Sequence, residues 1–160
     1  MKRVLMLRHA EATPARGGPQ DFERPLSERG RAEALAAARQ IAASGLRVDR
    51  LLVSPAARTR ETGAIVASEL GAAQRVHFEP TLYPGTPESL WASLQQLPER
   101  VRCALLIGHN PALSALARQC RAAQPGAELP TAGFCLAGFP ARVRWSALSP
   151  EDGSGLPLPG

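Results

Sequence analysis

The sequence alternates short aliphatic runs with stretches that carry helix-start signals, and this alternation limits the possible folds more than any other feature. Runs of mostly branched and aliphatic residues predict strands at residues 2–7, 49–53, 76–78 and 103–107. Strands that alternate with helical segments form a largely parallel sheet with helices on both faces. The chain is therefore predicted to be an α/β protein, a three-layer α/β/α sandwich with a mostly parallel central sheet.

Helix starts are marked by capping side chains, which in three places come directly before proline. Ser27 is expected to cap the first helix, because a serine hydroxyl can accept a hydrogen bond from a free N–H group of the first turn. Ser54-Pro55, Thr86-Pro87 and Asn110-Pro111 combine a capping side chain with a proline suited to the first helical position. The last pair is expected to open a helix over residues 112–119.

The end of the chain is predicted to depart from this alternation. Residues 133–139 and 142–145 are expected to form two strands, separated by Pro140 and pairing antiparallel near an edge of the sheet. Pro, Gly and Ser then become frequent, which predicts a flexible tail over residues 149–160. A chain of 160 residues fits one domain, here predicted to span residues 1–148.

The composition favours an ordinary cytoplasmic globular protein. Hydrophobic residues make up 44% and charged residues 21% of the chain, as in soluble domains. No apolar run approaches the ~20 residues of a membrane-spanning helix, and Arg8 and His9 interrupt the first one, so neither a membrane segment nor a signal peptide is expected. Cys103, Cys120 and Cys135 are widely spaced in apolar surroundings, which favours reduced core thiols without a catalytic role.

The net charge of +5 could attract nucleic acid, but the basic residues are scattered along the chain with few aromatic residues between them. Solvated arginines are the favoured interpretation, and no nucleic-acid partner is expected. Nearly all of the positive charge is arginine, whose planar guanidinium also suits bidentate binding of phosphate groups.

Residues suited to chemistry follow three of the predicted strands. Ligands of parallel α/β sheets bind at the carboxyl ends of the strands, where Arg8-His9, the loop into Arg58, and His109 are all expected. Phosphoryl transfer needs an in-line nucleophile together with cationic or N–H donors for the phosphoryl oxygens. Arg8 and Arg58 supply such donors, and the helix start at His109 favours an anion. His9 is then the expected nucleophile, because a neutral imidazole is competent near its ordinary pKa of ~6.5.

Three motifs make the sequence resemble the histidine phosphatase superfamily: Leu7-Arg8-His9-Ala10-Glu11, the segment 54–62 with Arg58, and Gly108-His109-Asn110-Pro111. Within that superfamily the chain is similar to small bacterial phosphohistidine phosphatases of the SixA type, through Arg24-Pro25-Leu26-Ser27 followed by Glu28-Arg29-Gly30. The resemblance spans roughly residues 2–139 and implies a phosphoglycerate mutase-like fold.

The resemblance implies that His9 becomes phosphorylated and that water then hydrolyses this phosphohistidine. It implies that Arg8 and Arg58 hold the phosphoryl oxygens, that His109 adds a positive or hydrogen-bonding contact, and that Asn110 belongs to the phosphate-binding set. No metal and no cofactor is expected. The implied substrate is a histidine-phosphorylated protein, either a two-component phosphotransfer domain or a sugar-transport phosphocarrier.

One departure from the wider superfamily concerns the acid that protonates the leaving group. Many members place a glutamate two residues after a leucine, whereas this chain reads Leu82-Tyr83-Pro84. An alkyl phosphate expels a leaving group of pKa ~16 and needs a proton donor, whereas phosphohistidine expels an imidazole of pKa ~6.5. The missing acid therefore favours a phosphohistidine substrate.

Two carboxylates and one loop have open roles. Glu11 could orient the site from behind the residues that touch substrate, or it could be a solvated loop carboxylate. Glu79 is a candidate substitute acid, although a polar strand-end residue before Pro80 explains it adequately. The loop over residues 13–25 is long enough to indicate a function, and its Arg16 is a candidate for contact with the substrate.

Three alternatives remain open. The same site could act on small phosphate esters or other phosphorylated metabolites. A non-catalytic module could bind phosphorylated proteins, with both arginines as a clamp. A zinc hydrolase could use His9 and His109, but no HExxH motif or carboxylate-rich ligand set accompanies them.

Overall fold

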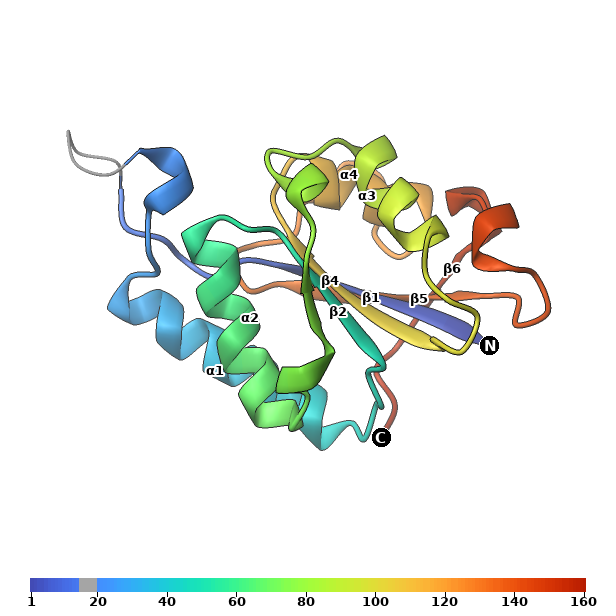
Figure 1. Cartoon of the computed structure of the whole chain (residues 1–160), viewed down its shortest axis with the longest axis horizontal. Helices are drawn as coiled ribbons and strands as arrows, with labels where there is room; N and C mark the ends of the chain where they lie inside the picture. Colours follow the sequence, from blue (N-terminus) through green and yellow to red (C-terminus); the bar gives the residue numbers. More distant parts are fainter. Residues whose placement is uncertain (15–19) are drawn as a thin grey trace.

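A computed structural model describes residues 1–14 and 20–160 of the chain. A central sheet lies between two layers of helices (Figure 1). The sheet has the strand order β3-β2-β4-β1-β5-β6. Its strands are β1 (Lys2–Arg8), β2 (Arg50–Val53), β3 (Val76–Phe78), β4 (Cys103–Gly108), β5 (Phe134–Phe139) and β6 (Ser154–Leu156).

The first four strands run parallel to one another, and the last two run antiparallel to their neighbours. Strand β4 lies between β1 and β2, and all six of its residues are buried. Central parallel strands are covered on both faces, so they consist of continuous aliphatic runs rather than of alternating polar and apolar residues. The predicted mostly parallel α/β/α sandwich is confirmed.

Two helices cover each face of the sheet. Helices α1 (Glu28–Ala43) and α2 (Ala57–Leu70) lie on one face, and α3 (Pro87–Gln95) and α4 (Ala112–Gln119) lie on the other (Figure 1). Successive side chains of a strand point to opposite faces, so each strand contributes to two cores. From β1, Val4 and Met6 join the core beneath α3 and α4, whereas Leu5 and Leu7 join the core beneath α1 and α2.

The helix starts agree only in part with the predicted caps. Ser27 caps α1, since its Oγ accepts a hydrogen bond of 3.0 Å from the Gly30 N–H group, and the Thr86 side chain caps α3. The predicted cap at Ser54 is wrong, because α2 begins three residues later and has Ala56 at its N-cap. The Asn110 Oδ1 atom does accept a hydrogen bond from the first turn of α4, from the Ser114 N–H group at 3.2 Å.

The C-terminal part differs more from the predictions. The predicted strand over residues 142–145 is wrong, because the chain there enters a 3₁₀ turn, Trp145–Ala147, whose indole is fully buried and donates to the Val101 carbonyl. Residues 149–160, for which the sequence predicts a tail, include β6, which pairs with β5. The glycines that predict a tail allow close packing here, since a Cβ atom on Gly155 would lie 2.7 Å from the Arg121 carbonyl oxygen.

The three cysteines carry free thiols. Cys103 and Cys120 are buried and Cys135 is half-buried. Burial raises their thiol pKa values to about 12 for Cys103 and Cys120 and to about 11 for Cys135, so the thiolate forms are unfavourable at neutral pH. This agrees with the predicted structural role of all three side chains.

Candidate active site

The carboxyl ends of β1, β2 and β4 bring three segments together. His9 follows β1, Ser54 follows β2, and His109 follows β4. Backbone hydrogen bonds continue past the strand ends, from the His9 N–H group to Gly108 and from the Ser54 N–H group to Ile107. The two imidazole rings lie with their centroids 5.3 Å apart, as the sequence predicts for residues at neighbouring strand ends.

His9 is oriented by the backbone of the residue that follows it. Its Nδ1 atom lies 2.7 Å from the Ala10 carbonyl oxygen, which can only accept, so Nδ1 carries the proton and Nε2 keeps its lone pair. The pKa of His9 is lowered to about 4, mainly by burial and also by the positive charges of Arg58, Arg8 and Arg24. At neutral pH, His9 is therefore a neutral imidazole with a free nucleophilic nitrogen.

His109 is oriented by a residue that the sequence analysis assigned to a different role. Its Nε2 atom lies 2.7 Å from the Ser54 Oγ atom, and its Nδ1 atom is buried without a hydrogen bond to the described residues. Burial, with the nearby charge of Arg58 as a smaller cause, lowers the pKa of His109 to about 3. A neutral imidazole carries one proton, so a Ser54 hydroxyl that donates to Nε2 leaves Nδ1 as an N–H donor.

Arg58 lies in the first turn of α2 and is only 6% exposed. Its Nη1 and Nη2 atoms donate to the backbone and side chain of Asp21, at 2.8 Å and 3.2 Å, and its Nε atom is buried without a described partner. Thr62 connects this helix to the loop after β1. Its Oγ1 atom donates to the Arg58 carbonyl and accepts from the Ala10 N–H group.

Arg8, the last residue of β1, donates from Nη1 to the Leu129 carbonyl oxygen at 3.1 Å, while its buried Nε atom has no described partner. Asn110 donates to the same carbonyl at 2.9 Å, and its Oδ1 atom accepts from the Ser114 hydroxyl and N–H groups. The amide of Asn110 thus joins α4 to the following loop through its oxygen and one of its two N–H donors. Its contact with phosphate stays a prediction.

The two carboxylates with open roles do not join this group. Glu11 accepts a hydrogen bond of 2.7 Å from the Ser27 hydroxyl and lies 3.8 Å from the Arg29 guanidinium, at the start of α1. Glu79 is half-buried, and its side chain forms no hydrogen bond or ion pair within residues 1–14 and 20–160. Arg16, the predicted substrate contact, lies outside the described residues.

Asp21 and Tyr83 are site residues that the sequence analysis did not identify. Asp21 opens the 3₁₀ turn Asp21–Glu23, in the loop for which a function was predicted. The Tyr83 hydroxyl donates to Asp21 Oδ2 at 2.6 Å, and the phenol ring lies edge-on to His109 with centroids 5.5 Å apart. The guanidinium carbon of Arg58 lies 5.9 Å from the centre of the same ring.

Asp21 is not suited to protonate a leaving group at neutral pH, and the Tyr83 hydroxyl proton is engaged in a hydrogen bond to Asp21. The Tyr83 hydrogen bond, followed by Arg24 and Arg58, lowers the pKa of Asp21 to about 2, so its carboxyl is an anion. The same hydrogen bond raises the pKa of Tyr83. The spacing of Asp21 and Arg24, three residues apart, could have predicted their ion pair. Only the fold shows that Asp21 also reaches Arg58.

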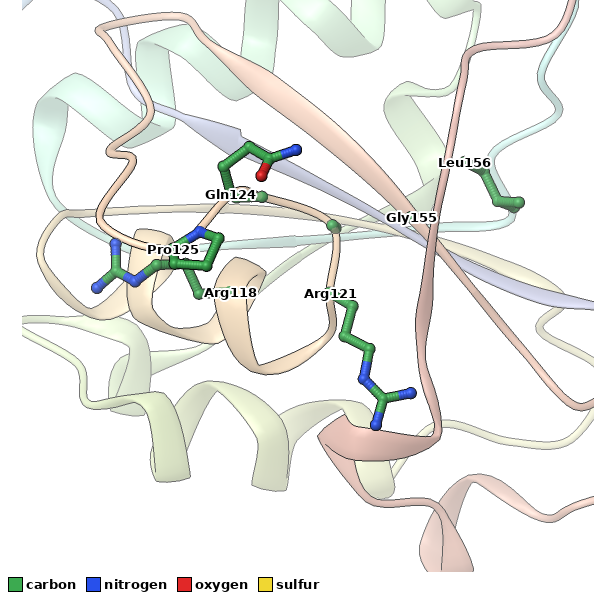
Figure 2. A pocket seen from close by; sticks show the side chains of 8 residues that line it. Arg118, Arg121, Gln124, Pro125, Gly155 and Leu156 are labelled. Atoms are coloured by element: carbon green, nitrogen blue, oxygen red, sulfur yellow. The ribbon is translucent and has the colours of Figure 1, made fainter.

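A separate pocket of about 510 Å³ lies at the other end of α4, between the loop that follows this helix and β6. Arg118 and Arg121 line it, but their guanidinium groups point away from one another (Figure 2). Arg118 also donates to the Ala127 carbonyl. The two charges therefore do not converge on one anion.

Residues 1–14 and 20–160 contain no group of three or more His, Cys, Asp and Glu side chains arranged to hold a metal ion. Among the same residues, no helix has both the length and the apolar character needed to cross a membrane.

Comparison with known proteins places this site in a family. Residues 4–83 match the sequence model of the histidine phosphatase superfamily (branch 1). A structure from Agrobacterium tumefaciens, assigned as a phosphohistidine phosphatase SixA, superposes with a TM-score of 0.77 at 31% identity, over 86% of this chain and 92% of that chain. The protein histidine phosphatase SixA in complex with tungstate superposes with a TM-score of 0.81 at 24% identity, over 96% and 94% of the two chains.

The chain also has a relative of similar sequence in Mycobacterium. An uncharacterized protein of Mycobacterium tuberculosis (strain CDC 1551 / Oshkosh) is 32% identical over 111 residues, which cover 69% of this chain and 67% of that protein. The structural matches confirm the predicted phosphoglycerate mutase-like fold. On the family match and these similarities, the chain belongs to the histidine phosphatase superfamily, as a phosphatase of the SixA type.

Proposed function

We propose that the protein removes phosphate from a histidine-phosphorylated protein, with His9 as the nucleophile. The observation that carries this proposal is the state of His9: a buried neutral imidazole whose Nδ1 proton is held by Ala10, so that Nε2 is free to attack. A neutral imidazole already carries the lone pair that attacks, so His9 needs no base to activate it.

In the proposed first step, His9 Nε2 attacks the phosphorus atom of the substrate, and the bond from phosphorus to the substrate imidazole breaks. The second nitrogen of the substrate imidazole takes a proton from solvent before or as this bond breaks, so the leaving group departs as a neutral imidazole, a weak base whose conjugate acid has a pKa of ~6.5. A water molecule then attacks phosphorylated His9. Inorganic phosphate leaves, and His9 returns to its neutral form.

The proposed roles of the other residues follow from charge. Arg8 and Arg58 stabilise the negative charge on the transferring group, and His109 donates from Nδ1. Three buried donor atoms of these residues, Nε of Arg8, Nε of Arg58 and Nδ1 of His109, make no hydrogen bond to the described residues. Buried polar atoms are normally paired, so these three support a ligand with several acceptor oxygens.

The chemistry of the leaving group supports phosphohistidine over an alkyl ester. The carboxylate bound to Arg58 is Asp21, which is an anion at neutral pH and cannot protonate an alkoxide. An alkyl phosphate would release an alkoxide, whose conjugate acid has a pKa of ~16, whereas phosphohistidine releases an imidazole, which leaves readily. We further propose that the protein acts in the cytoplasm on a phosphotransfer domain or a phosphocarrier.

The test compares phosphate release from a histidine-phosphorylated phosphocarrier with release from 4-nitrophenyl phosphate, both in EDTA. Wild type is expected to act faster on the phosphocarrier, and His9→Ala to abolish turnover of both. His77→Ala is the matched control, because His77 is an exposed histidine on β3. Turnover of the aryl phosphate alone would make the protein a small-ester phosphatase, and turnover of neither would favour a binding module.

A further inference from the structure

Arg58 and Arg8 have the same predicted role but different partners. Arg8 donates to the neutral Leu129 carbonyl. Arg58 donates from both terminal nitrogens to Asp21, and one of these bonds is an ion pair with the Asp21 carboxylate. The positive charge proposed to hold the phosphoryl group is therefore already paired with an anion of the same chain.

The Asp21 carboxylate is held by three residues at once. Its Oδ2 atom accepts from Tyr83 at 2.6 Å and from Arg58 at 3.2 Å. Its Oδ1 atom lies 3.0 Å from Arg24 Nε and 2.9 Å from Arg24 Nη2. Both oxygens thus bind guanidinium or hydroxyl groups, as the oxygens of a phosphoryl group would.

A phosphoryl group and this carboxylate would compete for Arg58, because both are anions that accept from its terminal N–H groups. The partner that would move is Asp21. Its side chain is 52% exposed, on a three-residue 3₁₀ turn without buried residues, whereas Arg58 is buried within the first turn of α2. Displacement of Asp21 needs little repacking, whereas displacement of Arg58 would disturb the core.

We propose that Asp21 determines substrate specificity: its carboxylate occupies Arg58 in the free protein, and the incoming phosphoryl group must displace it. This inference rests on the proposed phosphatase site. A small phosphate makes few contacts outside the phosphoryl site, so competition from Asp21 for Arg58 weakens its binding. A phosphoryl group on a protein arrives with contacts from its carrier, which offset the displacement of Asp21.

The test is binding of inorganic phosphate by isothermal titration calorimetry to wild type and to Asp21→Asn. The variant keeps the backbone carbonyl that accepts from Arg58 Nη1 but removes the competing charge. Phosphate is expected to bind about tenfold tighter to Asp21→Asn, as for one charge-assisted hydrogen bond of about 1.4 kcal/mol. The kcat/KM for 4-nitrophenyl phosphate is expected to rise by a similar factor, and that for the phosphocarrier to rise less.

Glu23→Gln is the matched control, because it removes one negative charge from the same turn and the Glu23 side chain forms no hydrogen bond or ion pair with the described residues. It should leave phosphate binding within about twofold of wild type. Tyr83→Phe removes one of the groups that hold Asp21 and should tighten phosphate binding by about two- to threefold. Urea unfolding of each variant shows whether the fold is intact.

Weaker or unchanged phosphate binding to Asp21→Asn would overturn the proposal. Weaker binding would show that Asp21 positions Arg58 for phosphate and does not compete with phosphate for it. The binding measurement needs no turnover, so it stays interpretable if the phosphohistidine substrate is wrong. That separate failure would show in wild type, as turnover of the aryl phosphate without turnover of the phosphocarrier.

Discussion

The site has two regions that differ in burial and in support. The inner wall, His9, Arg58 and His109, is 5–8% exposed and lies at strand ends or in the first turn of α2. The outer rim, Asp21, Phe22 and Tyr83, is exposed or half-buried and lies on 3₁₀ turns or directly after one. Phe22 packs edge-on to Tyr83 with centroids 4.9 Å apart.

Burial sets the charge state of the inner wall, whereas paired charges set that of the outer rim. On the inner wall, burial keeps both imidazoles neutral, which suits a nucleophile and an N–H donor. On the outer rim, a hydrogen bond and two arginines keep a carboxylate charged, which suits competition with an anion. The wall is therefore expected to govern the chemical steps, and the rim to govern which phosphates reach them.

The largest effect is expected from Arg58→Ala, which removes a buried charge of the inner wall. We expect kcat/KM to fall by about 10²–10³-fold, as for loss of one donor to a developing anion. Arg60→Ala is the control, because Arg60 lies on the same helix but is exposed. The measurement is steady-state phosphate release. Equal losses in the two variants would show that total charge matters rather than the position of Arg58.

The second prediction concerns the pH at which His9 gains a proton. With a pKa of about 4, most His9 is neutral at pH 5, about 30-fold more than for an imidazole with the ordinary pKa of ~6.5. Titration of the imidazole ¹⁵N resonances, assigned with His9→Gln, gives this value. A His9 midpoint near 6.5 would contradict the role assigned to burial.

The same pKa shifts affect stability. The folded protein binds protons at His9 and His109 more weakly than the unfolded chain does, so the free energy of unfolding should decrease as pH falls from about 6.5 to 4. Urea unfolding at several pH values measures this decrease. The slope should become smaller in the His9→Gln, His109→Gln double variant, which lacks both groups.

A smaller effect is expected from Ser54→Ala, because it leaves the inner wall in place but removes the partner of His109 Nε2. Loss of a hydrogen bond of about 1.4 kcal/mol corresponds to about a tenfold decrease in kcat/KM. Ser54→Thr, which retains the hydroxyl, should recover most of the activity. Comparable losses in both variants would point to packing rather than to this hydrogen bond.

The smallest effect is expected from Phe22→Ala on the outer rim. Phe22 is 37% exposed and contacts the site through Tyr83, so turnover of 4-nitrophenyl phosphate should change by less than about twofold. The free energy of unfolding should stay within about 0.5 kcal/mol of wild type. A loss as large as that of Arg58→Ala would remove the distinction between wall and rim.

Most of the fold could be predicted because its signals are local. The aliphatic runs of the parallel strands and the caps at Ser27 and Thr86 depend on residues close in sequence. Strand β6 could not be predicted, since three residues containing a glycine become a strand only by pairing with β5. Ser54 has a hydrogen-bonding side chain, as the cap prediction required. Its hydroxyl, however, bonds to His109, 55 residues later, rather than to the first turn of α2.

The sequence by itself predicted that the inner-wall residues would meet. His9 and His109 directly follow strands, Arg58 lies in the helix after β2, and parallel strands bring their carboxyl ends together. Only the tertiary structure decided the outer rim. Asp21 lies 37 residues before Arg58 and 62 before Tyr83, and no local pattern relates an exposed turn to either. Tertiary structure also decided the charge states, because burial lowers the imidazole pKa values and paired arginines keep Asp21 ionised.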